Sequence, residues 1–241
     1  MITLPSMVYP FSVMIIAAVA SLAFLCRIER NRILPTKFFF WHYTIGFAIL
    51  SLVNLPIFLI NYGVQISYNY LVILYCISFF AVLFSYLLFY RGTILLITKN
   101  RFFTTVFPLI FLPAFAAVAI IFFFLFKVEI FSIYTAVVWG FLIPLNGFLS
   151  SLFLYFFFRG APFDTIKRRP CAIILSLGWF LLTFVDILLW LNVAVYPREF
   201  WVLKIASAKE WYFLRGFSYL LILIGSLLYS RYLGQPKTLE K

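Results

Sequence analysis

The chain has 241 residues, of which 66% are hydrophobic, 22% are aromatic and only 11% are charged. Soluble domains average roughly 45–50% apolar and about 25% charged residues, so a water-soluble fold could not bury this much apolar surface. The composition therefore predicts an integral membrane protein. The net charge of +12 comes from short basic clusters between apolar runs, which argues against a nucleic-acid partner.

Long uncharged segments follow one another along the chain. A helix needs about 20 apolar residues to cross a hydrocarbon core of about 30 Å, and it satisfies its own backbone there. The sequence thus predicts a single all-α membrane domain over residues 1–241. Its seven transmembrane helices are expected at approximately 8–27, 38–60, 69–90, 104–126, 131–157, 171–195 and 211–232. The fourth contains no polar side chain over residues 106–126, so we expect it to be peripheral and to face lipid.

Lysine and arginine are unevenly shared between the two sets of loops. One set, with the C-terminal tail, contains Arg27, Arg30, Arg32, Lys37, Arg91, Lys99, Arg101, Arg159, Lys167, Arg168, Arg169, Arg231, Lys237 and Lys241. The other set contains Lys127, Arg198, Lys204 and Lys209. Because basic loops stay in the cytoplasm, this bias predicts an N-terminus outside and a cytoplasmic C-terminus. No charge precedes the first apolar run, which favours a retained helix over a cleaved signal peptide.

Several membrane chemistries require residues that the chain lacks at the right places. A retinal protein needs a lysine inside a helix, whereas every lysine here lies in a predicted loop or tail. Zinc hydrolases and bis-histidine haem proteins need several imidazoles, and His42 is the only histidine. An aspartyl protease needs two neighbouring carboxylates, and only Asp186 lies deep in a predicted helix. We therefore expect a non-enzymatic protein with no cofactor and no metal site.

The most informative polar pattern lies in the sixth predicted helix. Ser176, Trp179, Thr183, Asp186 and Trp190 recur at spacings of 3, 4, 3 and 4, which places them on one face. In lipid a polar face turns inward, and an ionisable residue inside the membrane is by default a candidate functional site. This face is therefore the predicted wall of a polar interior.

Arg215 in the seventh predicted helix can reach Asp186. Counted from the outer helix ends, their Cα atoms differ in depth by roughly 7–8 Å, a gap that the long arginine side chain can largely cover. An ion pair is one interpretation. The pair could also serve folding alone, Asp186 could be protonated, or Arg215 could extend to the outer headgroups. The full set of candidate ligand-binding residues is Asp186, Arg215, Trp190, Trp179, Thr183, Asn54 and Asn146.

The first three predicted helices share an arrangement with a known family. An outward N-terminus is followed by the basic loop Arg27 to Arg32, an aromatic-rich helix and a third helix that ends in Tyr90-Arg91. This resembles the seven-transmembrane sensor region of bacterial histidine kinases. The resemblance implies a bacterial inner or plasma membrane and a signalling partner in the cytoplasm or membrane. Family members normally carry a kinase or cyclase domain after the last helix, so a chain ending at Lys241 would be a stand-alone sensor or accessory subunit.

Three functions are compatible with these patterns. The first is a receptor or sensor-like accessory protein that binds a small molecule or lipid in the polar interior near the outer leaflet. The second is a small solute transporter with a three-plus-one-plus-three helix arrangement, in which Pro56 and Pro144 bend helices around a midplane site. The third is a scaffold subunit of a larger membrane complex. All three place the chain in the lipid bilayer.

Overall fold

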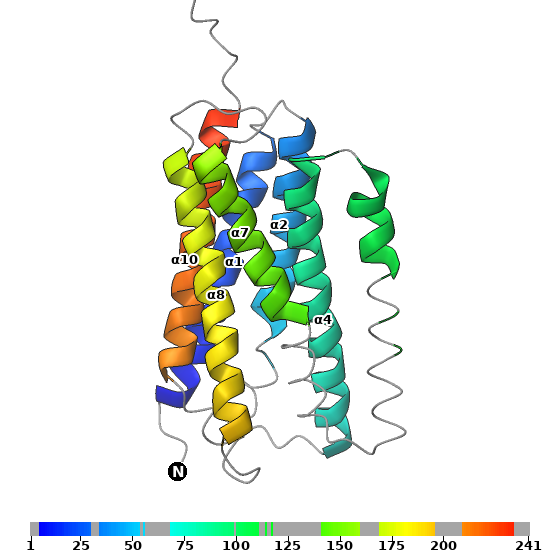
Figure 1. Cartoon of the computed structure of the whole chain (residues 1–241). Coiled ribbons are helices and arrows are strands. Elements are labelled where there is room, and N and C mark those ends of the chain that lie inside the picture. The colour runs from blue at the N-terminus through cyan, green and yellow to red at the C-terminus, as the bar shows by residue number, and fades with distance from the viewer. Residues whose placement is uncertain are drawn as a thin grey trace, which may run out of the picture.

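The computed structural model describes residues 5–29, 34–53, 55, 68–98, 100–110, 114, 117, 141–159, 169–195 and 209–233. Its elements are α1 (Pro5–Ile28), α2 (Leu34–Val53), α4 (Tyr68–Leu95), the π-helix η1 (Phe102–Val106), α7 (Ile143–Arg159), α8 (Arg169–Val195) and α10 (Lys209–Leu233). Within these ranges the chain is helical and contains no strand. Figure 1 shows the long helices side by side in one bundle, with α2 and α8 running in the opposite direction to α1, α4, α7 and α10.

Five helical stretches are long and apolar enough to cross a membrane. They are Val8–Ile28, Leu34–Val53, Phe80–Ile97, Pro170–Leu188 and Tyr212–Tyr229, and the stretch Ile143–Phe158 is apolar but shorter. The chain is therefore a multi-pass helical membrane protein, as its composition predicts. Each of these stretches falls on a predicted transmembrane helix. The count of seven spans and the orientation of the termini stay predictions, and much of the predicted 104–126 and 131–157 helices lies outside the described residues.

α2 and α4 extend four or more residues further than predicted at the same end of the bundle. α4 continues to Leu95, so Arg91 lies within a helix and not in a loop. Packing against α2 accounts for the extra turn, because the hydroxyls of Thr93 and Tyr43 lie 2.9 Å apart and both side chains are buried. α2 in turn begins at Leu34, so Lys37 is helical as well.

The helices form a ring in which each contacts its neighbours. The order is α4, α2, α1, α10, α8 and α7, and extensive packing joins every consecutive pair. The ring closes between α4 and α7, and these two helices touch only lightly over their described lengths. η1 lies outside the ring against α4, and Figure 1 shows it at the edge of the bundle. Only residues 104–110, 114 and 117 of the predicted fourth helix are described, so its peripheral, lipid-facing position stays a prediction.

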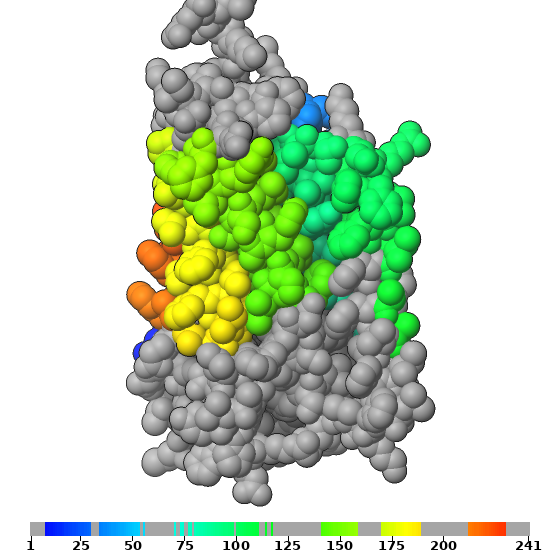
Figure 2. All heavy atoms as spheres, in the orientation of Figure 1, coloured from blue at the N-terminus to red at the C-terminus, as the bar shows by residue number. Residues whose placement is uncertain are grey.

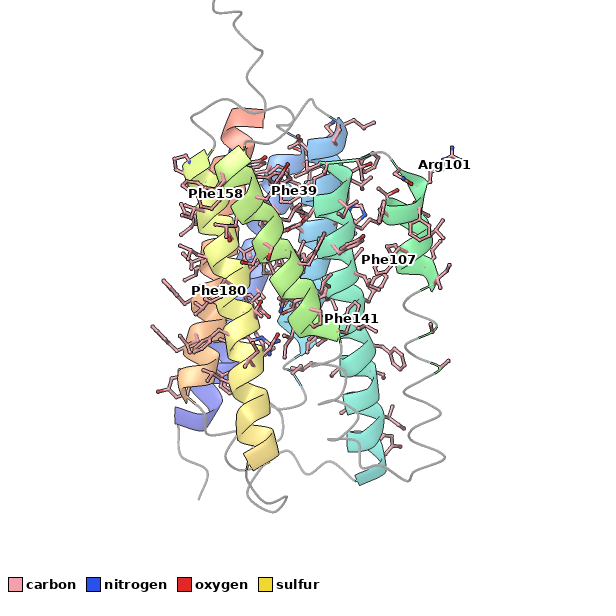
Figure 3. All side chains as sticks on the ribbon, in the orientation of Figure 1. Phe39, Arg101, Phe107, Phe141, Phe158 and Phe180 are labelled. Atoms are coloured by element: carbon pink, nitrogen blue, oxygen red, sulfur yellow. The ribbon has the colours of Figure 1, made fainter. Side chains whose placement is uncertain are left out.

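The buried and the exposed faces of the helices are both apolar. In α1, Phe11, Ile15, Val19 and Leu22 are exposed on one side, while Val13, Ala17, Ala20 and Phe24 are fully buried on the other. Both faces are apolar because lipid tails are as apolar as leucine, so helix association depends on close packing and on polar contacts. Figure 3 shows Phe158 of α7 and Phe180 of α8, two further exposed side chains, on the outside of the bundle.

Two glycines bring α8 and α10 unusually close. A Cβ atom at Gly225 of α10 would lie 2.8 Å from Cγ and 2.9 Å from the backbone nitrogen of Leu175. A Cβ atom at Gly178 of α8 would lie 2.8 Å from Cγ1 of Ile222. Small residues at such crossings let two backbones approach in membranes. The helices that carry Asp186 and Arg215 are therefore held tightly against each other.

Candidate functional site

A buried carboxylate and a buried amide meet inside the bundle. The side-chain nitrogen Nδ2 of Asn146, on α7, donates a hydrogen bond of 3.0 Å to Oδ2 of Asp186, on α8. Asp186 is 1% exposed and Asn146 is fully buried, so both are shielded from lipid as well as from water. A charged carboxylate in such a place is costly unless it is paired and hydrogen-bonded. The amide of Asn146 provides one of these contacts.

Arg215 supplies the positive charge of the cluster. Its side chain is only 5% exposed, and it interacts electrostatically with Asp186. It also acts on the phenol groups of Tyr86, on α4, and Tyr219, on α10. Arg215 therefore lies inside the bundle, and the alternative in which it extends to the outer headgroups does not describe this structure. We call Asp186, Asn146, Arg215, Tyr86 and Tyr219 the polar cluster.

The polar cluster still has hydrogen-bonding capacity. Oδ1 of Asp186 and Oδ1 of Asn146 are buried and accept no hydrogen bond from any group in the described part of the chain. Burying such an oxygen without a partner costs roughly 1–3 kcal/mol. The cluster therefore presents two acceptor oxygens, next to a guanidinium, that could take N–H or O–H donors from a bound molecule.

A pair of serines, Ser150 on α7 and Ser176 on α8, joins the two helices. Ser150 lies about one helical turn from Asn146 of the cluster. Ser150 Oγ donates to the carbonyl oxygen of Ser176 at 3.0 Å, and Ser176 Oγ donates to the carbonyl oxygen of Ser150 at 2.9 Å. Such reciprocal bonds fix the axial position of one helix against the other. We call Ser150 and Ser176 the serine clamp. Since Asn146 lies four residues before Ser150 on α7, the clamp also sets where the amide of Asn146 meets Asp186.

Aromatic rings form the layer beside the polar cluster. Trp179 is fully buried, and its ring centroid lies 5.6 Å from that of Phe89 and 6.3 Å from that of Tyr86. The ring of Phe47 lies 5.4 Å from that of Tyr219. These edge-on contacts are the arrangement that aromatic pairs favour. They connect α2, α4, α8 and α10 around the cluster and limit how far its side chains can move.

The structure brings together some of the predicted site residues. Asp186, Arg215 and Asn146 share the cluster, and Trp179 reaches it through Tyr86. Thr183 does not take part by its hydroxyl, which donates to the carbonyl oxygen of Trp179 at 2.9 Å in its own helix. The remaining two predicted site residues, Asn54 and the side chain of Trp190, lie outside the described residues.

Sequence reasoning missed Tyr86 and Tyr219. Tyr219 stands four residues after Arg215, so helical spacing could have found it. Tyr86 lies in an aromatic-rich run on a helix with little polar patterning, and no signal in the sequence separates it from its neighbours. Within the described ranges, no three histidine, cysteine, aspartate or glutamate side chains gather to hold a metal ion.

Comparison with known proteins adds no relative to this picture. No protein-family model, no curated protein and no solved structure matches the chain. The fold and the cluster therefore define a class, a multi-pass helical membrane protein with a buried polar cluster.

Proposed function

We propose that the chain is a non-enzymatic membrane receptor or sensor-like accessory protein whose polar cluster binds a small molecule or a lipid headgroup. The observation that carries this proposal is the pair of buried acceptor oxygens, Oδ1 of Asp186 and Oδ1 of Asn146, beside the guanidinium of Arg215. A ligand with N–H or O–H donors would complete their hydrogen bonding. In the orientation predicted from the basic residues, the ligand comes from the outer side.

The position of the cluster suits a receptor because four helices contribute to it. α4, α7, α8 and α10 each supply at least one of its side chains. A ligand shifts a conformational equilibrium only through a difference in affinity between two states. A molecule held by all four helices would favour the arrangement in which its contacts are complete, and a partner bound at the opposite membrane face could respond to that arrangement.

The proposal is tested by native mass spectrometry of the full-length protein, extracted in mild detergent from its own membrane. We expect a defined small molecule to accompany the wild type and to be lost from Asp186→Asn, whose side chain keeps the shape and one acceptor oxygen. Ser21→Ala is the matched control. The buried hydroxyl of Ser21, on α1, donates its hydrogen bond to the carbonyl oxygen of Thr44, in another part of the bundle. The control should retain the molecule.

The result also separates the other two functions. Flux of the bound molecule through proteoliposomes that contain the chain alone would identify a transporter instead. A stable chain that copurifies in fixed ratio with another protein and binds no small molecule would identify a scaffold subunit. If Asp186→Asn only lowers the yield of folded protein and the molecule stays bound, the ion pair serves folding and the proposed site is wrong.

A further inference from the structure

An apolar groove of about 510 Å³ lies where α4, the η1 segment and α7 come together, and no residue of the polar cluster lines it. Figure 2 shows these three parts of the chain on one face of the molecule. Cavities that hold small ligands span about 300–1,000 Å³, so the groove is large enough for an extended hydrocarbon chain. It lies at the place where the helix ring closes only lightly between α4 and α7.

Tyr90 of α4 forms the centre of the groove. Its ring centroid lies 5.4 Å from that of Phe107, beyond η1, and 6.1 Å from that of Phe148, on α7. One buried ring thus contacts an aromatic side chain on each wall. The walls are hydrophobic, and they come from segments far apart in the sequence.

Both π-helical segments of the described chain line this groove. Phe103 belongs to η1, and Phe141 is π-helical and lies directly before α7. Pro144 follows in the first turn of α7 and also lines the groove. π-Helical turns are rare and occur frequently at functional sites, where the wider turn changes the direction of side chains. The presence of two π-helical stretches in the lining favours a functional role for the groove.

The groove begins at a basic end of the bundle. Its α4 wall runs from Tyr90 to Thr98, and at ~1.5 Å per residue the helical part up to Leu95 covers about 8 Å, less than one leaflet of roughly 15 Å. Arg101, which is exposed, lies in the chain between the lining residues Thr98 and Phe103. Figure 3 shows Arg101 pointing away from the bundle at this end.

We propose that this groove is a binding site for one acyl chain of an anionic phospholipid, with the lipid phosphate at Arg101. The apolar walls take the chain, and the guanidinium takes the charge, to which a phosphate offers bidentate geometry. This end of the bundle also carries Arg27 and Lys37, and the distribution of basic residues predicts it to face the cytoplasm. Anionic lipids concentrate in that leaflet. The site is separate from the polar cluster and does not depend on the function proposed for it.

The test uses the full-length protein in nanodiscs of phosphatidylcholine that contain a small fraction of a photoreactive lipid. The probe is phosphatidylglycerol with a diazirine in one acyl chain, and the comparison probe is phosphatidylcholine with the same chain. After illumination, the labelled peptides are mapped by mass spectrometry. We expect labelling to concentrate on peptides containing Phe103, Phe141 or Phe148, with about a fivefold preference for phosphatidylglycerol, the factor that one basic residue near the surface supplies.

Two variants, each with a control variant, separate the contact with the acyl chain from the contact with the lipid charge. Thr98→Trp fills the mouth and should reduce groove labelling by about tenfold, whereas Phe180→Trp, on an exposed face of α8, should not change it. Arg101→Gln should abolish the preference for phosphatidylglycerol and leave labelling by phosphatidylcholine in place. Lys37→Gln, at the same end of the bundle, should keep the preference. Arg101 is exposed, so its replacement does not endanger folding.

Labelling spread evenly over the lipid-facing residues of the wild type would overturn the proposal. Equal labelling by the two probes would overturn it as well, because the phosphate would then have no preferred partner. Both of these results come from the wild-type protein and are obtained whether or not Thr98→Trp folds.

Discussion

Replacement of Gly225 by alanine tests how closely α8 and α10 must approach. The added methyl group would lie 2.8 Å from Cγ and 2.9 Å from the backbone nitrogen of Leu175. A side-chain atom could rotate away, but a backbone nitrogen moves only with its helix. Overpacking of this kind costs ~1–3 kcal/mol, against a gain of ~0.5–1 kcal/mol for alanine over glycine inside a helix. We expect the free energy of unfolding to fall by about 1–2 kcal/mol.

Gly147 of α7 provides the matched control. A Cβ atom there would find its nearest neighbour, Cγ2 of Thr183, at 4.0 Å, which is ordinary van der Waals contact. Gly147→Ala should therefore gain only the higher helix propensity of alanine and raise the free energy of unfolding by ~0.5–1 kcal/mol. Gly178→Ala should behave like Gly225→Ala, because its methyl group would lie 3.0 Å from the backbone nitrogen of Ile222.

The assay is reversible unfolding of the purified protein in mixed micelles with increasing sodium dodecyl sulfate, followed by circular dichroism. Gly225→Ala is expected to destabilise the protein and Gly147→Ala to stabilise it. This difference in sign does not depend on the absolute free energy of unfolding. Equal shifts for Gly225→Ala and Gly147→Ala, or stabilisation by both, would show that the α8–α10 contact is loose in the membrane protein. The reasoning from close helix approach would then be refuted.

The same unfolding assay checks three further expectations. Asp186→Leu leaves Arg215 without its carboxylate and should lower the free energy of unfolding by about 3–5 kcal/mol. The double variant Asp186→Leu with Arg215→Met should recover most of that loss. Additive losses would mean that the two residues are not coupled. A double-mutant cycle of Ser150→Ala and Ser176→Ala should give a coupling energy of about 0.6 kcal/mol, and at most about 1.7 kcal/mol, as for other hydrogen bonds between membrane helices; a coupling of zero would contradict the clamp. Tyr43→Phe removes a buried hydrogen bond between α2 and α4 and should lower the free energy of unfolding by about 0.6 kcal/mol; an unchanged value would show that the hydroxyl contributes nothing.

The fold class and the centre of the site could be predicted from the sequence because lipid tolerates few polar groups. Five of the predicted helices coincide with apolar helical stretches, and Asp186, Asn146 and Arg215 turn inward together. Their positions follow from the period of a helix and from the cost of exposing charge to hydrocarbon. The antiparallel course of the last two helices places Arg215 within electrostatic reach of Asp186.

Other features depend on tertiary packing and could not be predicted. Phenylalanine and tyrosine suit lipid-facing and interior positions alike, so nothing in the sequence distinguishes buried Tyr86 from exposed Phe84. α4 passes its predicted end because α2 packs against its last turns, a contact between residues 50 apart in the chain. The groove beside Tyr90 exists because α4 and α7 become neighbours in the ring, and the sequence does not specify that order.

The light contact between α4 and α7 has a consequence for how the polar cluster and the groove are related. Over their described residues, every other pair of neighbouring helices in the ring is packed extensively, whereas α4 and α7 touch lightly. Tyr86 of the polar cluster lies one turn along α4 from Tyr90, which lines the groove. A shift of α4 relative to α7 would therefore move one wall of the groove and one side chain of the polar cluster together.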